Sequence, residues 1–302
     1  IMDKFISYIS ADEKRKIIEK YLGEDFNQSS FDLTKEEKEY LASKPFLRTQ
    51  LEDQYFPYSF IKDGKNKGFI IDLTNIISEK LDKRIEFIPI KNKKQAKEML
   101  QNNELDFVSH HLKTPQREKD FLFTEKSLLD ANIGLLSKKN KNYSFKDIKG
   151  KTISIVKGYH LVKLLGKYYP NVKIKLFDNN FDLIQSVINE TSDFAISNYS
   201  ILTYLSKENQ VYDQLSNQLL NNEHFYKKPI HMAFNKSNTI LKSIIDKVIK
   251  STPNMQINKL KDKWFVEVEK EAFLAKNEEI WLEDNKIIKI CANPIWAPIS
   301  FN

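Results

Sequence analysis

Arg117 is the residue whose possible chemistry stands out first, because arginine is rare in this chain. Only four arginines, at positions 15, 48, 84 and 117, stand against 44 lysines. Arg117 follows Thr114-Pro115-Gln116 just past a predicted strand, and its planar guanidinium can grip a carboxylate through two parallel charge-assisted hydrogen bonds. The alternative interpretation is a surface ion pair with Glu118 or Asp120.

Two further features could bind a small anionic ligand together with Arg117. Gly158, Tyr159 and His160 open a predicted helix, whose free N–H groups and positive dipole end favour an anion. Ordinary helix capping is the alternative for these three residues. The ring of Tyr55 can stack on a ligand, or it can be a buried core aromatic.

The histidines and the single cysteine do not predict a metal site. Cys291 is alone, whereas a disulfide or a cysteine-based zinc site needs at least two thiols. His110 and His111 are adjacent, so in a strand they face opposite sides, and one of them can line a cleft. His224 and His231 have no acidic or cysteine partner at ligand spacing. We expect no metal, no cofactor and, without a nucleophile-base signature, no catalysis in this chain.

Composition indicates a folded, soluble protein that binds no nucleic acid. A length of 302 residues predicts about two modules, and 41% hydrophobic with 29% charged residues is typical of a globular chain. The net charge of +7 is spread over lysines that alternate with acids, whereas nucleic-acid surfaces concentrate arginine and stacking aromatics. The longest apolar stretch, 287–301, is interrupted by a lysine and two prolines and predicts no membrane span.

Two runs of alternating strand and helix signals must position these residues. In the first run strands are predicted at 46–51, 84–90 and 105–109, with helices at 69–81 and 94–101. In the second run strands are predicted at 152–156, 172–177 and 193–196, with helices at 159–168, 181–189 and 199–205. Extended segments at 132–137 and 230–235 would cross between the runs, and helices at 239–250 and 255–265 would return to the first. The sequence therefore predicts an α/β fold with two lobes and a two-strand hinge.

An internal repeat indicates that the chain holds more than one module. Residues 33–60 align without gaps on residues 274–301, and residues 2–22 align on residues 245–265. The two alignments occur in consistent order with nearly equal offsets, although short amphipathic helices can also match by chance. The predicted boundaries are the tail of a preceding module at 1–24, a linker helix at 25–45, a complete module at 46–266, a linker helix at 267–285 and the start of a following module at 286–302. Within the complete module, lobe one covers 46–132 and 235–266, and lobe two covers 138–229.

Several motifs of the complete module resemble the type II periplasmic binding protein family, in its amino-acid-like branch. They are Tyr55-x-Pro57-Tyr58 after the first strand, G-F-I-I-D-L at 68–73, T-P-Q-R at 114–117 followed by F-L-F-T at 121–124, V-K-G at 156–158 and D-F-A-I-S-N at 193–198. The resemblance covers residues 46–265 and implies a Venus flytrap, with a ligand in the cleft at the carboxyl ends of the strands. By this resemblance the ligand-binding residues are expected to be Arg117, Tyr55, Glu52, Ser109, His110, Thr114, Gly158, Tyr159, His160 and Asn198.

Two positions depart from the amino-acid-binding pattern of that family. Asn198 stands where the family has an Asp that pairs with the ligand's ammonium, and Leu112 stands where it has a small hydroxyl. A neutral amide cannot compensate a buried ammonium. A simple carboxylate, or another small polar or aromatic molecule, therefore becomes a candidate ligand unless Glu52 or Asp53 supplies the missing charge.

Tandem flytrap arrays resemble the extracytoplasmic part of membrane-bound hybrid sensor histidine kinases and of related receptors with cyclic-dinucleotide enzymes. We therefore expect a periplasmic sensing domain of an inner-membrane receptor, which binds a small carboxylate or amino-acid-like molecule and signals by lobe closure. The expected partners are that ligand, adjacent flytrap modules and a second copy of the receptor. The alternatives are the solute-binding component of a transporter and a dehydratase-like enzyme on the same fold, with Glu52 or Asp53 as the acid.

Overall fold

The computed structural model describes residues 31–141, 143–159, 161–222 and 224–265, together with 281, 284–285, 295–296 and 300–301. His160, the predicted tail at 1–24 and most of the segments predicted at 267–285 and 286–302 lie outside the described residues, and so does much of the internal repeat. Within the described part, no helix is both long and apolar enough to cross a bilayer. In the same part, no group of three or more His, Cys, Asp or Glu side chains could hold a metal ion.

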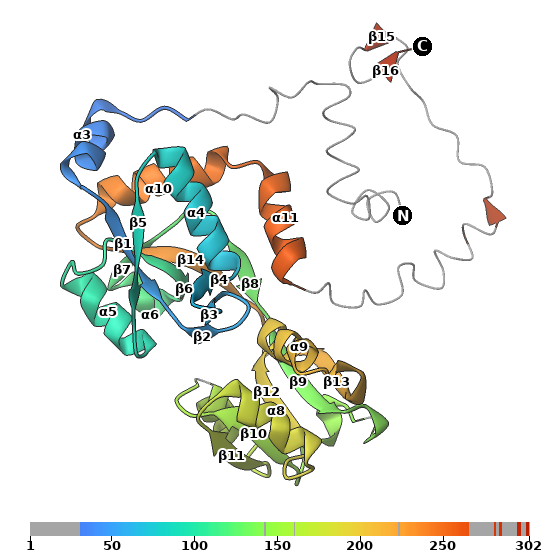
Figure 1. Ribbon diagram of the computed structural model, residues 1–302. Coiled ribbons are helices and arrows are strands. Elements are labelled where there is room, and N and C mark those ends of the chain that lie inside the picture. Colours follow the sequence, from blue (N-terminus) through green and yellow to red (C-terminus); the bar gives the residue numbers. More distant parts are fainter. Residues whose placement is uncertain are drawn as a thin grey trace.

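The first lobe contains a parallel strand pair and an antiparallel sheet, with helices around them (Figure 1). Strand β1 (Leu47–Leu51) pairs in parallel with β5 (Ile85–Pro89), and helix α4 (Phe69–Leu81) lies between them in the sequence. The apolar residues of α4 recur at helical spacing and bury one of its faces against the lobe core. Fully or almost fully buried on this helix are Phe69, Ile70, Leu73 and Ile77.

A small antiparallel sheet leads from β1 into α4 and holds the aromatic residues of the first motif. Its strands are β2 (Gln54–Tyr55), β3 (Ser59–Lys62) and β4 (Lys65–Lys67). Gly68 precedes α4 with φ 127°, and a Cβ atom there would lie 2.3 Å from the carbonyl oxygen of Tyr58. Only glycine fits this close approach, so Gly68 fixes the position of Tyr58 beside the helix.

Strand β14 (Lys228–Asn235) lies at the centre of the antiparallel sheet of the first lobe. It pairs with β6 (Val108–Leu112) on one side and with β7 (Phe121–Phe123) and β8 (Leu129–Ala131) on the other. The remaining helices of this lobe are α5 (Lys93–Gln101), α6 (Pro115–Glu118), α10 (Thr239–Ser251) and α11 (Asn254–Trp264). Strand β1 also contacts β6, so the side chains at the ends of these two strands can meet.

The second lobe is a five-stranded sheet in the order β11-β10-β12-β9-β13 (Figure 1). Its strands are β9 (Ile133–Lys138), β10 (Thr152–Val156), β11 (Lys173–Phe177), β12 (Phe194–Asn198) and β13 (Leu215–Leu220). Strand β10 pairs in parallel with β11 and β12, whereas β9 is antiparallel to β12 and β13. The helices are α7 (Leu161–Tyr168), α8 (Asn180–Ile188) and α9 (Tyr199–Glu208), with 3-10 turns η2 (Lys139–Lys141), η3 (Phe145–Ile148) and η4 (Tyr212–Gln214). An apolar core that includes Ile153, Leu165, Phe194 and Ile196 is buried within this lobe.

The chain crosses between the lobes at Asn132 and again between β13 and β14. All of β9 belongs to the second sheet and all of β14 to the first, so neither strand is itself a crossing. The crossings therefore lie at Asn132 and between Leu220 and Lys228, outside the two strands that cover most of the predicted segments 132–137 and 230–235. Lobe two begins at β9 instead of at residue 138, and lobe one includes β14 from Lys228 onward.

The two lobes contact each other in this structure. The hydroxyl of Tyr58, from the first lobe, donates to Oδ1 of Asn198, from the second, at 3.1 Å, and both side chains are buried. An exposed ion pair between Lys62 and Glu208, at 2.7 Å, also joins the lobes. The two lobes are therefore in a closed arrangement, joined by these contacts.

Helix α3 (Lys35–Ser43) lies within the span 25–45 that was predicted as a linker helix, and it packs on the first lobe. Thr34 and Glu37 form a reciprocal capping box at its start. The Glu37 carboxylate, whose residue is 4% exposed, accepts hydrogen bonds from Lys247 at 2.7 Å and Ser243 at 2.8 Å on α10. The buried Glu37 carboxylate and its partners on α10 thereby attach α3 to the first lobe.

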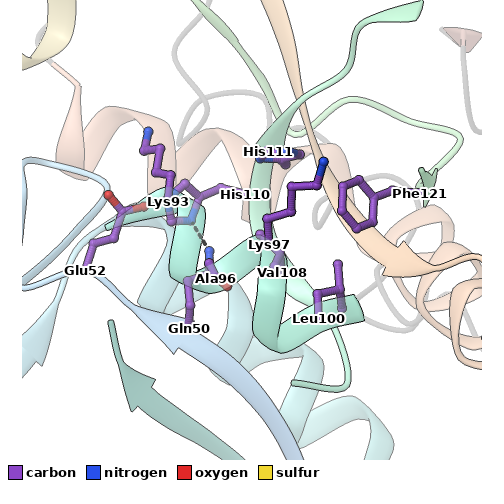
Figure 2. Close-up of a pocket in the computed structure, with 10 residues that line it drawn as sticks. All are labelled: Gln50, Glu52, Lys93, Ala96, Lys97, Leu100, Val108, His110, His111 and Phe121. Atoms are coloured by element: carbon purple, nitrogen blue, oxygen red, sulfur yellow. Dashed lines mark hydrogen bonds and ion pairs between the residues drawn. The ribbon is translucent and has the colours of Figure 1, made fainter. Parts of the chain in front are cut away.

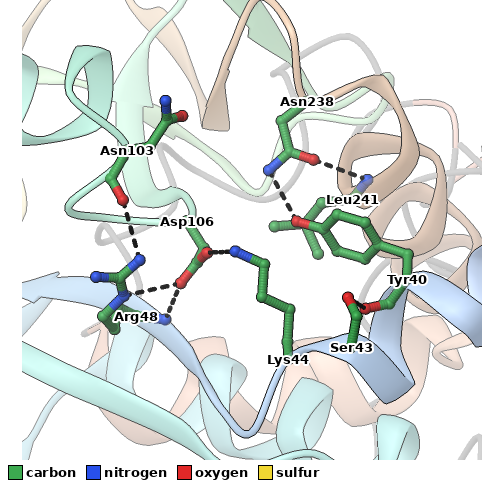
Figure 3. A network of polar contacts seen from close by, with 8 residues as sticks. All are labelled: Tyr40, Ser43, Lys44, Arg48, Asn103, Asp106, Asn238 and Leu241. Carbon is green, nitrogen blue, oxygen red and sulfur yellow. Dashed lines mark hydrogen bonds and ion pairs between the residues drawn. The ribbon is translucent and has the colours of Figure 1, made fainter.

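A second polar network joins the end of α3 to the first lobe (Figure 3). Lys44 donates to Asp106 at 2.9 Å, and the other oxygen of Asp106 accepts from Nε of Arg48 at 3.2 Å and from its backbone N–H at 2.8 Å. The hydroxyl of Tyr40 accepts a hydrogen bond from Asn238 at 3.1 Å. The path from α3 into β1 is therefore held by charged groups whose partners are all in the first lobe.

The two-lobed α/β fold predicted from the sequence is confirmed, with shifts at some element ends. The strand predicted at 105–109 is β6 at 108–112, and the helix predicted to open at 159 begins at Leu161. Eight strands of the described part were not predicted: β2, β3, β4, β7, β8, β13, β15 (Ile295–Trp296) and β16 (Ser300–Phe301).

Candidate functional site

A chain of buried hydrogen bonds connects the ends of β1 and β6 (Figure 2). Oε1 of Gln50 accepts from the backbone N–H of Ser109 at 2.9 Å and from the hydroxyl of Thr49 at 2.9 Å. Its amide nitrogen, 3.1 Å from Nδ1 of His110, can only donate. Nδ1 is therefore the acceptor, and Nε2 of His110 carries the hydrogen that it donates to Glu52 at 2.7 Å.

Glu52 holds a negative charge in this cluster. Burial by itself raises the pKa of the Glu52 carboxyl, but the ammonium of Lys93 and the hydrogen bond from His110 lower it to about 2. Nζ of Lys93 lies 4.2 Å from the centroid of the Tyr55 ring, and that ring stacks on His110 at 5.2 Å. The carboxylate is thus already compensated by neighbours from its own lobe.

Little empty space remains inside the Glu52 cluster itself. A cavity of about 10 Å³ lies between this cluster and α5, which is room for about one water molecule. Figure 2 shows Gln50, Glu52 and His110 on one side of it and Lys97 with Phe121 on the other. A ligand larger than water must therefore bind beside this cluster rather than within it.

Arg117 is positioned by the single turn of α6. Thr114 caps this turn, and its hydroxyl accepts from the backbone N–H of Arg117 at 3.4 Å. The guanidinium donates from Nη1 to the carbonyl oxygen of Leu112 at 3.0 Å, which turns the side chain back towards the end of β6. Burial lowers the pKa of Arg117, and the side chain is half-buried.

The acids beside Arg117 are paired with lysines instead. Glu118 pairs with Lys113 at 3.3 Å, and Asp120 pairs with Lys97 at 2.8 Å. Arg117 forms no ion pair with any acid that the structure describes. The alternative of a surface pair with Glu118 or Asp120 is therefore wrong for this structure, and the guanidinium keeps most of its donors available.

Other cationic and neutral groups lie close to Arg117. The pKa of Lys228, at the start of β14, is lowered by burial and by the nearby charge of Arg117. Burial, together with Arg117, lowers the pKa of His111 to about 3, so that imidazole is neutral at ordinary pH. Two positive charges thus lie near each other at the hinge end of β14, where a bound anion would relieve their repulsion.

From the second lobe, Tyr159 reaches towards the cluster around Glu52 and Lys93. Burial raises the pKa of Tyr159 to about 12, and the same hydroxyl is influenced by Lys93 and Tyr58 of the first lobe. Gly158 has φ 75° and lies on the surface of the turn before α7. His160 is outside the described residues. The predicted anion site at the start of this helix therefore stays a prediction, and α7 begins two residues after Tyr159.

Three other predicted ligand residues are engaged within the protein. Oδ1 of Asn198 accepts from Tyr58 at 3.1 Å and, as the cap of α9, from the backbone N–H groups of Ser200 at 2.9 Å and Ile201 at 3.3 Å. Ser109 is 0% exposed and lies behind His110, with its hydroxyl 3.4 Å from Nδ1. Thr114 caps α6. In this structure Asn198 closes the lobes, Ser109 supports His110 and Thr114 positions Arg117.

Sequence reasoning missed Gln50, Lys93 and Lys228. Gln50 orients His110, Lys93 compensates Glu52, and Lys228 adds positive charge beside Arg117. The three come from β1, the start of α5 and the start of β14, so only the tertiary fold brings them together. A Gln beside apolar Leu51, in a predicted strand, was the one available signal.

Several known proteins are similar to this chain. The sensor protein EvgS of Escherichia coli is 22% identical over 275 residues, which cover 87% of this chain and 22% of EvgS. The arginine-binding extracellular protein ArtP of Bacillus subtilis is 26% identical over 216 residues, covering 70% of this chain and 82% of ArtP. The chain spans between 22% and 56% of the length of the first curated relatives that it matches.

The fold and the sequence agree on the family. The crystal structure of the Bordetella pertussis BvgS periplasmic VFT2 domain superposes with a TM-score of 0.67 at 17% identity, covering 78% of this chain and all of that one. That likeness shows a Venus flytrap of the periplasmic binding protein type II fold. The family model of bacterial extracellular solute-binding proteins, family 3, matches residues 47–267. Since that match covers most of the chain, the protein belongs to the bacterial extracellular solute-binding proteins, family 3.

Proposed function

We propose that this chain is an extracytoplasmic sensing domain that binds a small carboxylate between its lobes, as part of a transmembrane signalling receptor. Arg117 provides the observation that carries the ligand class. It is half-buried, it has no acidic partner among the described residues, and only one of its donors is used, by Leu112. A buried guanidinium without a counter-ion is costly, and a carboxylate is the ligand whose geometry matches its fork.

The charges around the site favour a simple carboxylate over an α-amino acid. Arg117, Lys93 and Lys228 are cationic, whereas the Glu52 carboxylate is already bonded to His110. Asn198 offers no charge, and its oxygen is occupied by three donors. An ammonium group in the cleft would therefore find no free carboxylate among these residues, and its desolvation would not be repaid.

Two observations support sensing over transport. The similarity to EvgS runs over 275 residues, which is longer than the family match at 47–267, so it extends into segments that flank the flytrap. Helix α3, ahead of the module, is attached to the first lobe through Glu37 and Lys247. Closure of the lobes around a ligand would then move a helix that leads to the preceding segment of the receptor.

The other properties expected of such a receptor are part of this proposal. The domain lies in the periplasm, next to further flytrap modules, and the receptor works as a homodimer whose output is a histidine kinase. The ligand acts by its greater affinity for the closed state. This fold is that of a binding domain, and within the described residues we find no positive evidence for catalysis.

A thermal-unfolding screen with small monocarboxylates, dicarboxylates and amino acids tests the ligand class. A ligand at one hundred times its dissociation constant adds about 2.7 kcal/mol to the free energy of unfolding. The Arg117→Gln variant should bind a hit at least about tenfold more weakly, since a hydrogen bond to a charged group contributes about 1.5 to 3 kcal/mol. Arg84→Gln is the matched control, because Arg84 is exposed and paired with Glu86.

The signalling role is tested in the full-length receptor. With the screen's best carboxylate, autophosphorylation of the receptor in membrane vesicles should change, and Arg117→Gln should abolish that change. If the full reading frame instead encodes a lone binding protein beside a permease, the transport alternative holds and the sensing proposal is wrong.

A further inference from the structure

A second cavity lies at the hinge, apart from the residues of the cleft. Its volume is about 500 Å³, within the usual range of about 300 to 1,000 Å³ for small-molecule sites. None of its lining residues belongs to the cluster around Glu52 or Arg117. It is lined by Lys126, Ser127, Leu128, Leu129, Asp130, Asn132, Tyr199, Ser200, Lys261, Asp262 and Phe265.

The lining combines an apolar wall with an uncompensated cation. Lys261, on α11, is half-buried, and its ammonium makes no hydrogen bond or ion pair with any residue that the structure describes. Burial lowers the pKa of Lys261, and the charge of Lys126 lowers it further, with Asp130 opposing. Asp130 is committed to Lys227 at 2.9 Å, and Asp262 on the rim is exposed. Neither aspartate of the lining forms an ion pair with Lys261, so its ammonium is available to an anionic ligand.

The other walls suit an apolar body with a few polar atoms. Leu128 is buried in the core, while Leu129 and Phe265 pack against that core from the edge of the cavity. Ser127 and Ser200 add hydroxyl groups that can donate to an anion. A molecule with one negative charge and a hydrophobic ring or chain matches this lining.

The cavity is formed by both lobes. Leu129 and α11 belong to the first lobe, whereas Tyr199 and Ser200 start α9 in the second. The ring centroids of Phe265 and Tyr58 lie 5.3 Å apart. Although burial raises the pKa of the Tyr58 hydroxyl, Ser200 lies close enough to it to lower that pKa. A ligand in this cavity would therefore contact both lobes, which the hydrogen bond between Tyr58 and Asn198 joins in the closed arrangement.

We propose that this hinge cavity is a second ligand site, which binds a small monocarboxylate with an apolar body through Lys261 and favours the closed arrangement of the lobes. The site is separate from the proposed carboxylate site at Arg117. Because its walls come from both lobes, its occupant binds the closed state more tightly than the open one, and closing of the cleft strengthens its binding in return.

The test uses 4-fluorobenzoate as the probe, with binding followed by the broadening of its ¹⁹F resonance. The whole chain should bind the probe with a dissociation constant of about 1 mM or tighter. Lys261→Gln should weaken binding at least about tenfold, and Lys261→Arg, which keeps the charge, should stay within about threefold of the original protein. The matched control is Lys259→Gln, an exposed lysine of the same helix that does not line the cavity.

Arg117→Gln separates this site from the cleft. The probe should still bind this variant, and it should still be displaced from it by benzoate. The proposal is overturned if the original protein shows no binding, if Lys261→Gln binds as well as Lys259→Gln, or if only Arg117→Gln loses the probe. In the last case the cleft proposal stands while the hinge site fails. Conversely, if every ligand found in the screen binds Arg117→Gln as tightly as the original protein, the cleft proposal is wrong and the hinge-site proposal is unaffected.

Discussion

Replacing Tyr58 with Phe removes one hydrogen bond between the lobes and preserves the ring. In the original protein the hydroxyl donates to Oδ1 of Asn198 at 3.1 Å. The same oxygen accepts from the backbone N–H groups of Ser200 and Ile201, so it is not left without a partner in the variant. The loss is that of one neutral hydrogen bond, about 0.5 to 1.5 kcal/mol. The ratio of open to closed molecules should therefore rise about twofold to thirteenfold.

Other contacts between the lobes remain in this variant and limit the effect. Phe56 still stacks on Tyr204, with ring centroids 5.7 Å apart. The exposed ion pair between Lys62 and Glu208 contributes at most about 1 kcal/mol. The variant should consequently open more often without losing its fold, and its melting temperature should change little.

Single-molecule fluorescence energy transfer measures the ratio of open to closed molecules directly. Dyes are attached at Lys94→Cys, exposed on the first lobe, and at Lys175→Cys, exposed on the second, with Cys291→Ser as the background. Tyr168→Phe is the matched control, since Tyr168 is 39% exposed at the end of α7 in the second lobe. If Tyr58→Phe and Tyr168→Phe give the same ratio, the hydrogen bond does not hold the lobes together and the reasoning is refuted.

Four other variants test the packing and the charges. Because the pKa of the Glu52 carboxyl is lowered, its charged form stabilises the fold at pH values above its unfolded pKa of 4.5, and this contribution is lost as the pH falls through about 2. In Glu52→Gln the free energy of unfolding, measured with urea, should therefore fall less between about pH 4.5 and pH 2 than in the original protein. An equal fall in both proteins would contradict this. Glu37→Gln should weaken the docking of α3 by about 1 to 3 kcal/mol, seen as faster hydrogen exchange of its amides, and equal exchange would show that the pair with Lys247 is not needed. Gly68→Ala should lower the free energy of unfolding by more than about 1 kcal/mol, because its Cβ would meet the carbonyl oxygen of Tyr58 at 2.3 Å. Gly166→Ala, on α7 where a Cβ meets no other atom, should raise the free energy of unfolding by up to about 1 kcal/mol. Equal urea midpoints for the two variants would contradict both expectations.

Much of the fold could be predicted because its main elements have clear periodicity. Helix α4 and strand β10 coincide with the predicted ranges, since each carries apolar residues at the spacing of one buried face or core strand. The strands β2 to β4 carry exposed lysines and few alternating apolar residues, so no pattern marked them. Strand β6 was placed about three residues early, because the buried run before it continues the apolar signal without belonging to the sheet.

The candidate site was predictable only where a residue type was itself unusual. Arg117 was found because arginines are rare, and the structure leaves it without an acidic partner in the described residues. The sequence predicts Asn198 as a ligand residue, but its side chain accepts from the backbone N–H of Ser200 and caps α9, and Asn is a common residue at a helix N-cap. Lys93 and Lys228 could not be found, since their roles depend on distant segments meeting in space.

A crystal structure with the strongest carboxylate of the screen tests the central claim most directly. The account predicts the carboxylate between the lobes, with its oxygens about 2.7 to 2.9 Å from the guanidinium nitrogens of Arg117 and with atoms of Tyr159 against the same molecule. A carboxylate bound elsewhere, with the Arg117 guanidinium bare in a closed cleft, would contradict it.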